Sequence, residues 1–201
     1  MSKVLEIMKQ LEEEDRKQRE AGLPSEERNR SISRDTGEFL ALLVRIHKPR
    51  QIIEIGTSVG YSTLWLGISA RTVNAKIISY EISEERVEKA RKNLLKAELT
   101  EVVKIHHGDP RQARLQEVDL VFLDAEKADY IDHFNAVFPV LTKGGVVVAD
   151  NVTSHGDELQ DYILHVRHHP SCNSMLVPIG RGLEVTRKLD PAEVEVFKSL
   201  Y

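Results

Sequence analysis

The sequence contains one cysteine, Cys172, and no long apolar run. A single cysteine excludes an internal disulfide framework and a zinc site built from several cysteines, so a reducing, cytoplasmic setting is expected. Every apolar run stays far below the ~20 residues that a membrane-spanning helix needs, and no basic region followed by an apolar core marks an export signal. We therefore expect no membrane partner.

An excess of positive charge is also missing. The chain carries 28 Lys and Arg residues against 32 Asp and Glu residues, a formal net charge of -4. A nucleic-acid partner is therefore not expected. The 201 residues are 41% hydrophobic and 30% charged, which is typical of a folded globular protein. Because no linker or internal repeat is visible, residues 1–201 are expected to form a single domain.

The hydrophobic pattern divides the chain at about residue 48. Residues 1–48 are expected to form an N-terminal helical segment, with one helix ending before Gly22 and a second running from Ser31 or Ser33 to His47. Residues 49–201 alternate short apolar runs with helical patterns. Strands are predicted at 51–55, 76–81, 102–106, 118–123, 145–149, 174–177 and 183–187, and helices at 62–70, 84–97, 130–141 and 157–168. This alternation predicts an α/β fold, a doubly wound and mostly parallel sheet with a closing antiparallel strand.

Glycines and acidic residues follow the predicted strands. Sheets of this kind bind ligands beyond the carboxyl ends of their strands. The candidate positions are therefore Glu54–Gly60, Glu81, Asp109, Asp124–Lys127 and Asp150–Asn151.

The turn after the first strand contains Gly56 and Gly60 but lacks the middle glycine of a dinucleotide fingerprint, because Ser58 stands there. Glu54 would repel a phosphate and suits a ligand with positive charge, such as an amino group or a sulfonium. Glu81 ends the next strand, where an acid commonly accepts hydrogen bonds from ribose hydroxyls. Together they indicate a nucleoside ligand without a pyrophosphate; the alternatives are a tight turn with a buried acid and a helix-capping acid.

A second cluster follows two later strands. If these strands are neighbours, Asp124, Asp150 and Asn151 converge and offer oxygen donors to a hard divalent cation such as Mg²⁺ or Mn²⁺. The alternative is that each acid caps the helix that follows it. Lys127 could act as a general base near such a cation, or it could be an ordinary surface lysine.

With these motifs the sequence resembles the metal-dependent class I S-adenosylmethionine O-methyltransferases of the catechol and caffeoyl-coenzyme A type, over about residues 33–188. The first motif of that family is similar to Glu54–Thr57 with Gly60–Ser62. Its metal and base motifs are similar to Asp124–Lys127 and Asp150–Asn151. The resemblance implies a Rossmann-like methyltransferase sheet.

The resemblance also implies roles for individual residues. Cofactor contacts would come from Ser33, Glu54, Gly56, Thr57, Gly60, Ser62, Glu81, Asp109, Pro110 and Asp124. A divalent metal, Mg²⁺ or else Mn²⁺ or Ca²⁺, would be held by Asp124, Asp150 and Asn151. Lys127 would be the base, and Glu184 would contact the substrate hydroxyl. Arg181 stands where relatives commonly have an acid.

The implied activity is transfer of a methyl group from S-adenosylmethionine to a hydroxyl of a small, catechol-like vicinal diol chelated to the metal. The resemblance also suggests a homodimer. Two alternatives stay open. One is a non-catalytic module that binds the methyl donor or a partner. The other is a nicotinamide-dependent oxidoreductase, which the missing middle glycine disfavours.

Overall fold

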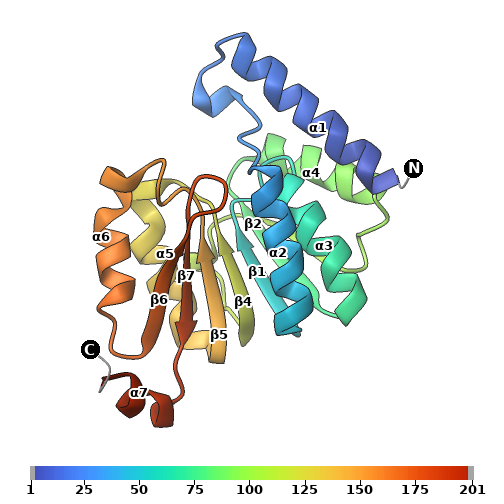
Figure 1. Ribbon diagram of the computed structural model, residues 1–201. Coiled ribbons are helices and arrows are strands. Elements are labelled where there is room, and N and C mark those ends of the chain that lie inside the picture. Colours follow the sequence, from blue (N-terminus) through green and yellow to red (C-terminus); the bar gives the residue numbers. More distant parts are fainter. Residues whose placement is uncertain (1–2, 199–201) are drawn as a thin grey trace.

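The computed structural model describes residues 3–198, which form one seven-stranded sheet flanked by helices (Figure 1). The strands are β1 (Gln51–Ile55), β2 (Lys76–Glu81), β3 (Val103–His107), β4 (Val118–Leu123), β5 (Leu141–Ala149), β6 (Cys172–Val177) and β7 (Leu183–Lys188). The α-helices are α1 (Lys3–Glu20), α2 (Arg34–His47), α3 (Tyr61–Val73), α4 (Glu84–Lys96), α5 (Tyr130–Val137), α6 (Gly156–Arg167) and α7 (Pro191–Lys198).

The sheet order is β3-β2-β1-β4-β5-β7-β6, and β7 pairs antiparallel with both of its neighbours while β1 to β5 run parallel. The predicted α/β fold with a closing antiparallel strand is therefore confirmed. Consecutive strands pass outward on one side from β1 to β3 and then return to β4. The reversal lies between β1 and β4, and the crevice at their carboxyl ends is where an open α/β sheet binds ligands.

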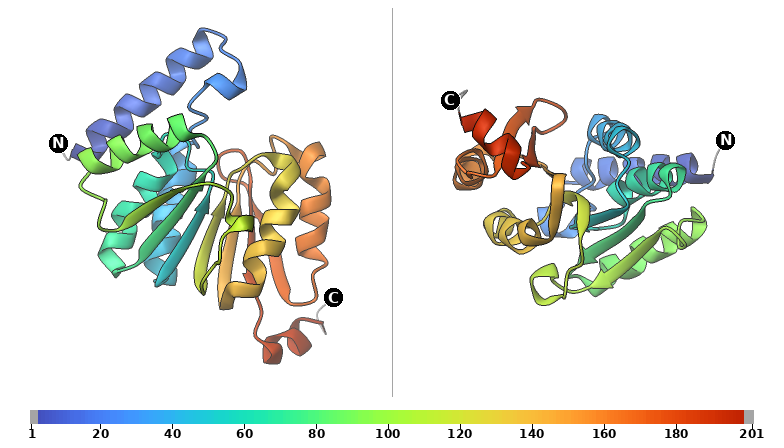
Figure 2. Two further views of the ribbon diagram at one scale, coloured as in Figure 1. Left: turned by 180° about the vertical axis from the view of Figure 1, so that it is seen from behind. Right: turned by 90° about the horizontal axis from the view of Figure 1, so that it is seen from below.

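Each face of the sheet has its own apolar core, because successive side chains along a strand point to opposite faces. Ile52 and Phe122 lie on the face covered by α1 to α4, whereas Ile53 and Val121 lie on the face covered by α5 and α6 (Figure 2). Burial on both faces explains why adjacent residues of these strands, such as Ile52 with Ile53 and Val121 with Phe122, are apolar.

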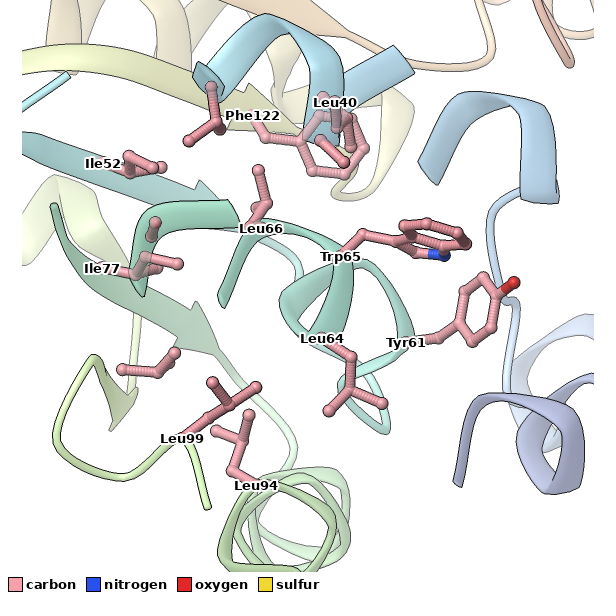
Figure 3. Packing of buried hydrophobic residues seen from close by; sticks show 14 of the residues in the cluster. Leu40, Ile52, Tyr61, Leu64, Trp65, Leu66, Ile77, Leu94, Leu99 and Phe122 are labelled. Carbon is pink, nitrogen blue, oxygen red and sulfur yellow. The ribbon is translucent and has the colours of Figure 1, made fainter. Parts of the chain in front are cut away.

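Helix α3 is buried on most sides, as expected for a helix between a sheet and two other helices. Figure 3 shows Leu66 beside Leu40 and Phe122, with Leu64 on the side of Leu94. At its first turn, Tyr61 donates a hydrogen bond from Oη to Oε1 of Glu12 on α1, at 2.5 Å. The N-terminal helix is thereby attached to the helix that follows the glycine turn.

The structure differs from the sequence-based expectation mainly around Pro139 and at the C-terminal helix, while other boundaries shift by one to three residues. The helix predicted over 130–141 ends at Val137 and continues as a short 3-10 turn, because Pro139 cannot donate the next helical hydrogen bond. Strand β5 therefore begins at Leu141 instead of residue 145, and its pairing with β4 shifts register between Val118 and Leu120. Helix α7 was not predicted at all.

Helix α2 begins where one of the two predicted caps stands. Ser33 accepts a hydrogen bond at Oγ from the Thr36 amide at 3.1 Å, and the helix ends at Lys48 in the left-handed conformation. Across residues 3–198 no helix has both the length and the apolar character that a membrane crossing requires.

Candidate active-site cleft

A cleft of about 390 Å³ lies at the carboxyl ends of the parallel strands, in the size range of small-molecule sites. Its floor is formed by the loops after β1, β2, β3, β4 and β5, and the turn between β6 and β7 contributes Arg181. Residues 28–32, here called the roof segment, line it from the N-terminal side. This is the place that the strand-end rule predicted.

The glycine turn brings the backbones of β1 and β4 together. Gly56 has φ +100°, and a Cβ placed on it would lie 2.1 Å from the carbonyl oxygen of Asp124. Its amide donates to the Tyr80 carbonyl at 2.9 Å. Only a residue without a side chain fits between the two strand ends, so Gly56 fixes the position of Asp124 beside the turn.

Replacing Gly56 with alanine should therefore lower the free energy of unfolding by about 3–5 kcal/mol, because backbone strain and a steric clash add. Gly22 is a matched control: it also has positive φ, +68°, but a Cβ there meets nothing within 4 Å. Its alanine variant should lose about 1 kcal/mol. Urea denaturation of both variants gives the comparison, and equal losses would contradict the assigned clash.

Glu54 is completely buried on the same sheet face as Ile52. Its carboxylate accepts hydrogen bonds from the hydroxyls of Ser62 and Thr63 at 2.6 Å each and of Ser79 at 2.5 Å. Burial raises the pKa of Glu54 to about 7, although these hydrogen bonds oppose the rise. Glu54 does not itself line the cleft, whereas Ser62 does. Ser62 thus stands between the Glu54 carboxylate and any ligand.

The raised pKa makes stability depend on pH. A glutamate carboxyl in water has an ordinary pKa of 4.5, whereas the pKa of Glu54 in the folded protein is about 7. Between these values the folded protein holds a proton that the unfolded chain has lost. The free energy of unfolding should fall as the pH rises through this window, by roughly 3 kcal/mol at most. Below it, where the carboxyl is protonated in both states, no loss is expected.

Glu54→Gln should remove the part of this dependence that Glu54 contributes and keep the part from Asp150, whose pKa is also raised to about 7. Urea denaturation of the ligand-free proteins from about pH 4 to about pH 8 tests it, with the exposed Glu117→Gln as the control. A stability difference between wild type and Glu54→Gln that stays constant over the whole range would contradict the assignment.

Glu81 lies at the end of β2 and lines the cleft while only 5% exposed. The backbone amides of Ser58 and Ser83 donate to its two carboxylate oxygens at 2.8 and 2.9 Å. These contacts fix the carboxylate beside the glycine turn, where it can accept further hydrogen bonds from vicinal hydroxyls. The structure thus brings the two predicted parts of a nucleoside site together.

The wall beyond Glu81 contains Asp109 and Pro110, as the sequence indicated. Arg111 donates to Asp109 from its amide and side chain at 2.8 Å, and these bonds lower the pKa of Asp109. His133 of α5 also lines this wall; it is 5% exposed, and its Nδ1 has no hydrogen-bond partner. Sequence reasoning missed His133, because nothing in the pattern of α5 marks the face that reaches the cleft.

The opposite end of the cleft holds the carboxylate cluster. Strands β4 and β5 are neighbours, with Leu123 paired to Ala149, so Asp124 and Asp150 follow at adjacent strand ends. Asn151 donates from Nδ2 to Oδ1 of Asp124 at 2.7 Å, and Lys127 Nζ lies 3.2 Å from the same oxygen. Lys127 also donates to the Tyr130 hydroxyl at 2.9 Å. The predicted convergence of these side chains is therefore observed.

The donor set suits a hard divalent cation. Asp150 is 1% exposed, and burial together with the charge of Asp124 raises its pKa to about 7. Two carboxylates that repel each other, with an amide beside them, match the oxygen ligands of Mg²⁺ or Ca²⁺. Within residues 3–198 no group of three or more His, Cys, Asp or Glu side chains could hold a metal, so the candidate site depends on the Asn151 amide as its third ligand.

Five of the predicted residues do not line the cleft. Two are Glu54, described above, and Asp150, which is 1% exposed; the others are Ser33, Gly60 and Glu184. Ser33 caps α2, and Gly60 begins α3 with φ +91° and packs near Ala90. Glu184, expected at the substrate, is fully buried on β7, where Arg167 donates two hydrogen bonds to it at 2.8 Å and Ser174 donates one at 2.7 Å. Its carboxylate is committed to α6 and β6, so the structure gives it a packing role.

The roof segment contributes residues that sequence reasoning did not identify. Arg30 has φ +53° and forms an ion pair with Glu126 at 2.6 Å, which joins the roof to the loop after β4. The Asn29 carbonyl accepts a hydrogen bond from Ser58 Oγ at 2.6 Å. These contacts hold the segment over both ends of the cleft.

The known proteins that are similar to this chain are O-methyltransferases. The family model described as O-methyltransferase matches residues 2–189. The catechol O-methyltransferases of Niastella koreensis and Mycobacterium tuberculosis are 34% and 32% identical over 149 and 136 residues, or 71% and 65% of this chain. The aligned regions span 65% and 61% of those relatives.

Among solved structures, the O-methyltransferase from Bacillus cereus in complex with SAH superimposes with a TM-score of 0.74 at 26% identity, covering 89% of this chain and 90% of that one. The shared architecture extends over nearly the whole sheet and its helices. On the strength of the family match, which spans almost the entire sequence, this chain belongs to the O-methyltransferase family.

Proposed function

We propose that this protein transfers a methyl group from S-adenosylmethionine to one hydroxyl of a small vicinal diol, most simply a catechol, with Lys127 as the general base. One observation carries the proposal. A single cleft holds the amide-bound Glu81 at one end and the Asp124, Lys127 and Asn151 cluster at the other. A nucleoside and a metal-bound acceptor could therefore meet between them.

Each group of residues in and around the cleft would bind a different part of the reactants. Glu81 would accept the ribose hydroxyls, Asp109 and Pro110 would border the adenine, and the turn at Gly56 with Ser62 would hold the methionine moiety. Asp124, Asp150 and Asn151 would hold a divalent cation, which when bound supplies Lewis acidity that lowers the pKa of a coordinated hydroxyl. The catechol and SAH named for the relatives above support this division.

The chemical step is a direct displacement. Lys127, as the neutral amine, accepts the proton of one acceptor hydroxyl at Nζ. The acceptor oxygen then bonds to the sulfonium methyl carbon while the carbon–sulfur bond breaks. The electron pair stays on sulfur, giving neutral S-adenosylhomocysteine and a methyl ether. The chain's main contribution is orientation, since the cleft holds both reactants and the roof segment covers them.

The proposal is tested by calorimetric titration of S-adenosylmethionine into chelator-treated protein, followed by incubation with Mg²⁺ and catechol and measurement of S-adenosylhomocysteine. We expect binding without metal and release only with Mg²⁺ and catechol together. Binding with no release over a panel of diols would instead support a non-catalytic methyl-donor module. Binding of a nicotinamide dinucleotide in preference to the methyl donor would support an oxidoreductase.

A further inference from the structure

Several arginines line the cleft, and in three of them a nearby carboxylate neutralises the charge of the guanidinium. Each of three has a carboxylate within 2.6 Å, in the pairs Arg19 with Asp15, Arg30 with Glu126 and Arg111 with Asp109. Such pairs leave little charge available for a ligand. Arg181 has no such pair, because over residues 3–198 no carboxylate oxygen lies within 4.0 Å of its guanidinium, the distance that defines the ion pairs above. Arg28 also lines the cleft without a described ion pair, but it belongs to the roof segment and its Nε is buried.

The backbone holds Arg181 firmly at the metal end of the cleft. It lies between Gly180 and Gly182, both with positive φ, at the turn between β6 and β7. Its carbonyl accepts hydrogen bonds from the amides of Thr153 and Ser154 at 3.0 and 3.1 Å, which fixes the turn against the loop after β5. Precise placement of a half-buried cation without an ion-pair partner is typical of a ligand-binding group.

The guanidinium lies beside the proposed acceptor position. Its Nη1 is 3.5 Å from Oδ1 of Asn151, a weak contact that leaves the other donors of the fork unengaged by any described carboxylate. A divalent cation and a sulfonium would add three positive charges to an end that holds the carboxylates of Asp124 and Asp150. Passage of the diol proton to Lys127 leaves the total charge unchanged. An anionic group on the acceptor would offset part of this excess positive charge.

We propose that Arg181 determines acceptor specificity by binding a carboxylate that the diol carries, so that the preferred acceptors are acidic catechols. This inference rests on the proposed function and narrows its substrate class. The planar fork of Arg181 matches a carboxylate, and two parallel hydrogen bonds would orient the ring as well as hold it. Neutral catechols lack that anchor.

The test compares protocatechuate, a catechol with a ring carboxylate, with unsubstituted catechol in wild type and Arg181→Met. With Mg²⁺ and S-adenosylmethionine present, we expect the variant's KM for protocatechuate to rise roughly 10- to 100-fold, as for loss of a charge-assisted hydrogen bond. Its kcat/KM for catechol should stay within about threefold of wild type. Calorimetry with S-adenosylhomocysteine in place of the methyl donor should show the same selective loss in protocatechuate affinity.

Two further variants make the comparison specific. Arg181→Lys keeps the charge without the fork and should recover part of the lost affinity. Arg71→Met removes an exposed arginine at the far end of α3 and should change neither acceptor. Equal changes for both acceptors in Arg181→Met, or none, would overturn the inference while leaving the proposed function intact. Transfer by wild type to neither acceptor would overturn the proposed function itself, and the inference with it.

Discussion

Replacing Lys127 with alanine is expected to lower kcat roughly 10²- to 10⁴-fold, the range found for loss of a general base. The side chain is almost fully covered, and its Nζ lies 3.2 Å from Asp124, between that carboxylate and Tyr130. S-adenosylmethionine affinity should stay within about threefold, because Lys127 is placed at the acceptor end of the cleft. Steady-state kinetics and calorimetry measure the two effects separately.

Lys127→Arg separates a base from a mere positive charge. Arginine preserves the charge beside Asp124 but cannot release its proton at accessible pH. We therefore expect it to be about as inactive as the alanine variant. Recovery of turnover in Lys127→Arg would show that the cation itself is needed, and would remove proton transfer from the role of this residue.

Asp150→Ala is expected to abolish Mg²⁺-dependent transfer, a loss of at least about 10³-fold, as expected for loss of a metal's contribution to charge stabilisation. The protein should remain folded. Burial and the charge of Asp124 already disfavour ionised Asp150, whose pKa is raised to about 7, so removing this carboxyl relieves an unfavourable charge. Thermal unfolding should then show an unchanged or higher Tm without metal.

Binding of the metal can also be measured without turnover, as a shift in Tm. In wild type, Mg²⁺ should raise Tm because it binds the folded state alone, and this increment should vanish in Asp150→Ala. Asp161→Ala, an exposed acid on α6, is the matched control and should keep the increment. A full Mg²⁺ increment in Asp150→Ala would exclude Asp150 as a ligand.

Much of the fold was accessible from the sequence because its strands are buried on both faces. β4 is apolar except for Asp119, and β1 and β2 each contain a pair of adjacent isoleucines; a glycine or an acid ends or follows each of the three strands. The hydrophobic pattern and the residue types at the turns therefore indicate the same positions for the strand ends. Polar residues at the ends of parallel strands then converge once the strand order is known, which is why Asp124 and Asn151 could be placed together.

The surroundings of several site residues could not be read from the sequence, because distant partners decide them. Glu184 belongs to a short Gly-Leu-Glu stretch, but its surroundings are set by Arg167, 17 positions earlier on another element. The hydroxyls that surround Glu54 come from α3 and β2, so its burial could not be read from its own strand. Arg181 and the roof segment lie in loops, where no periodicity indicates which side chains face the cleft.

The roof segment also bears on how fast the protein can work. It is held over the glycine turn by the Asn29–Ser58 hydrogen bond and over the carboxylate cluster by the Arg30–Glu126 ion pair. A molecule lying beneath the roof segment would have both contacts above it, so we expect their opening to be a step of release that is separate from the bonds being made. Added salt weakens the ion pair, because it is partly exposed, and we expect it to speed release before it affects the reaction.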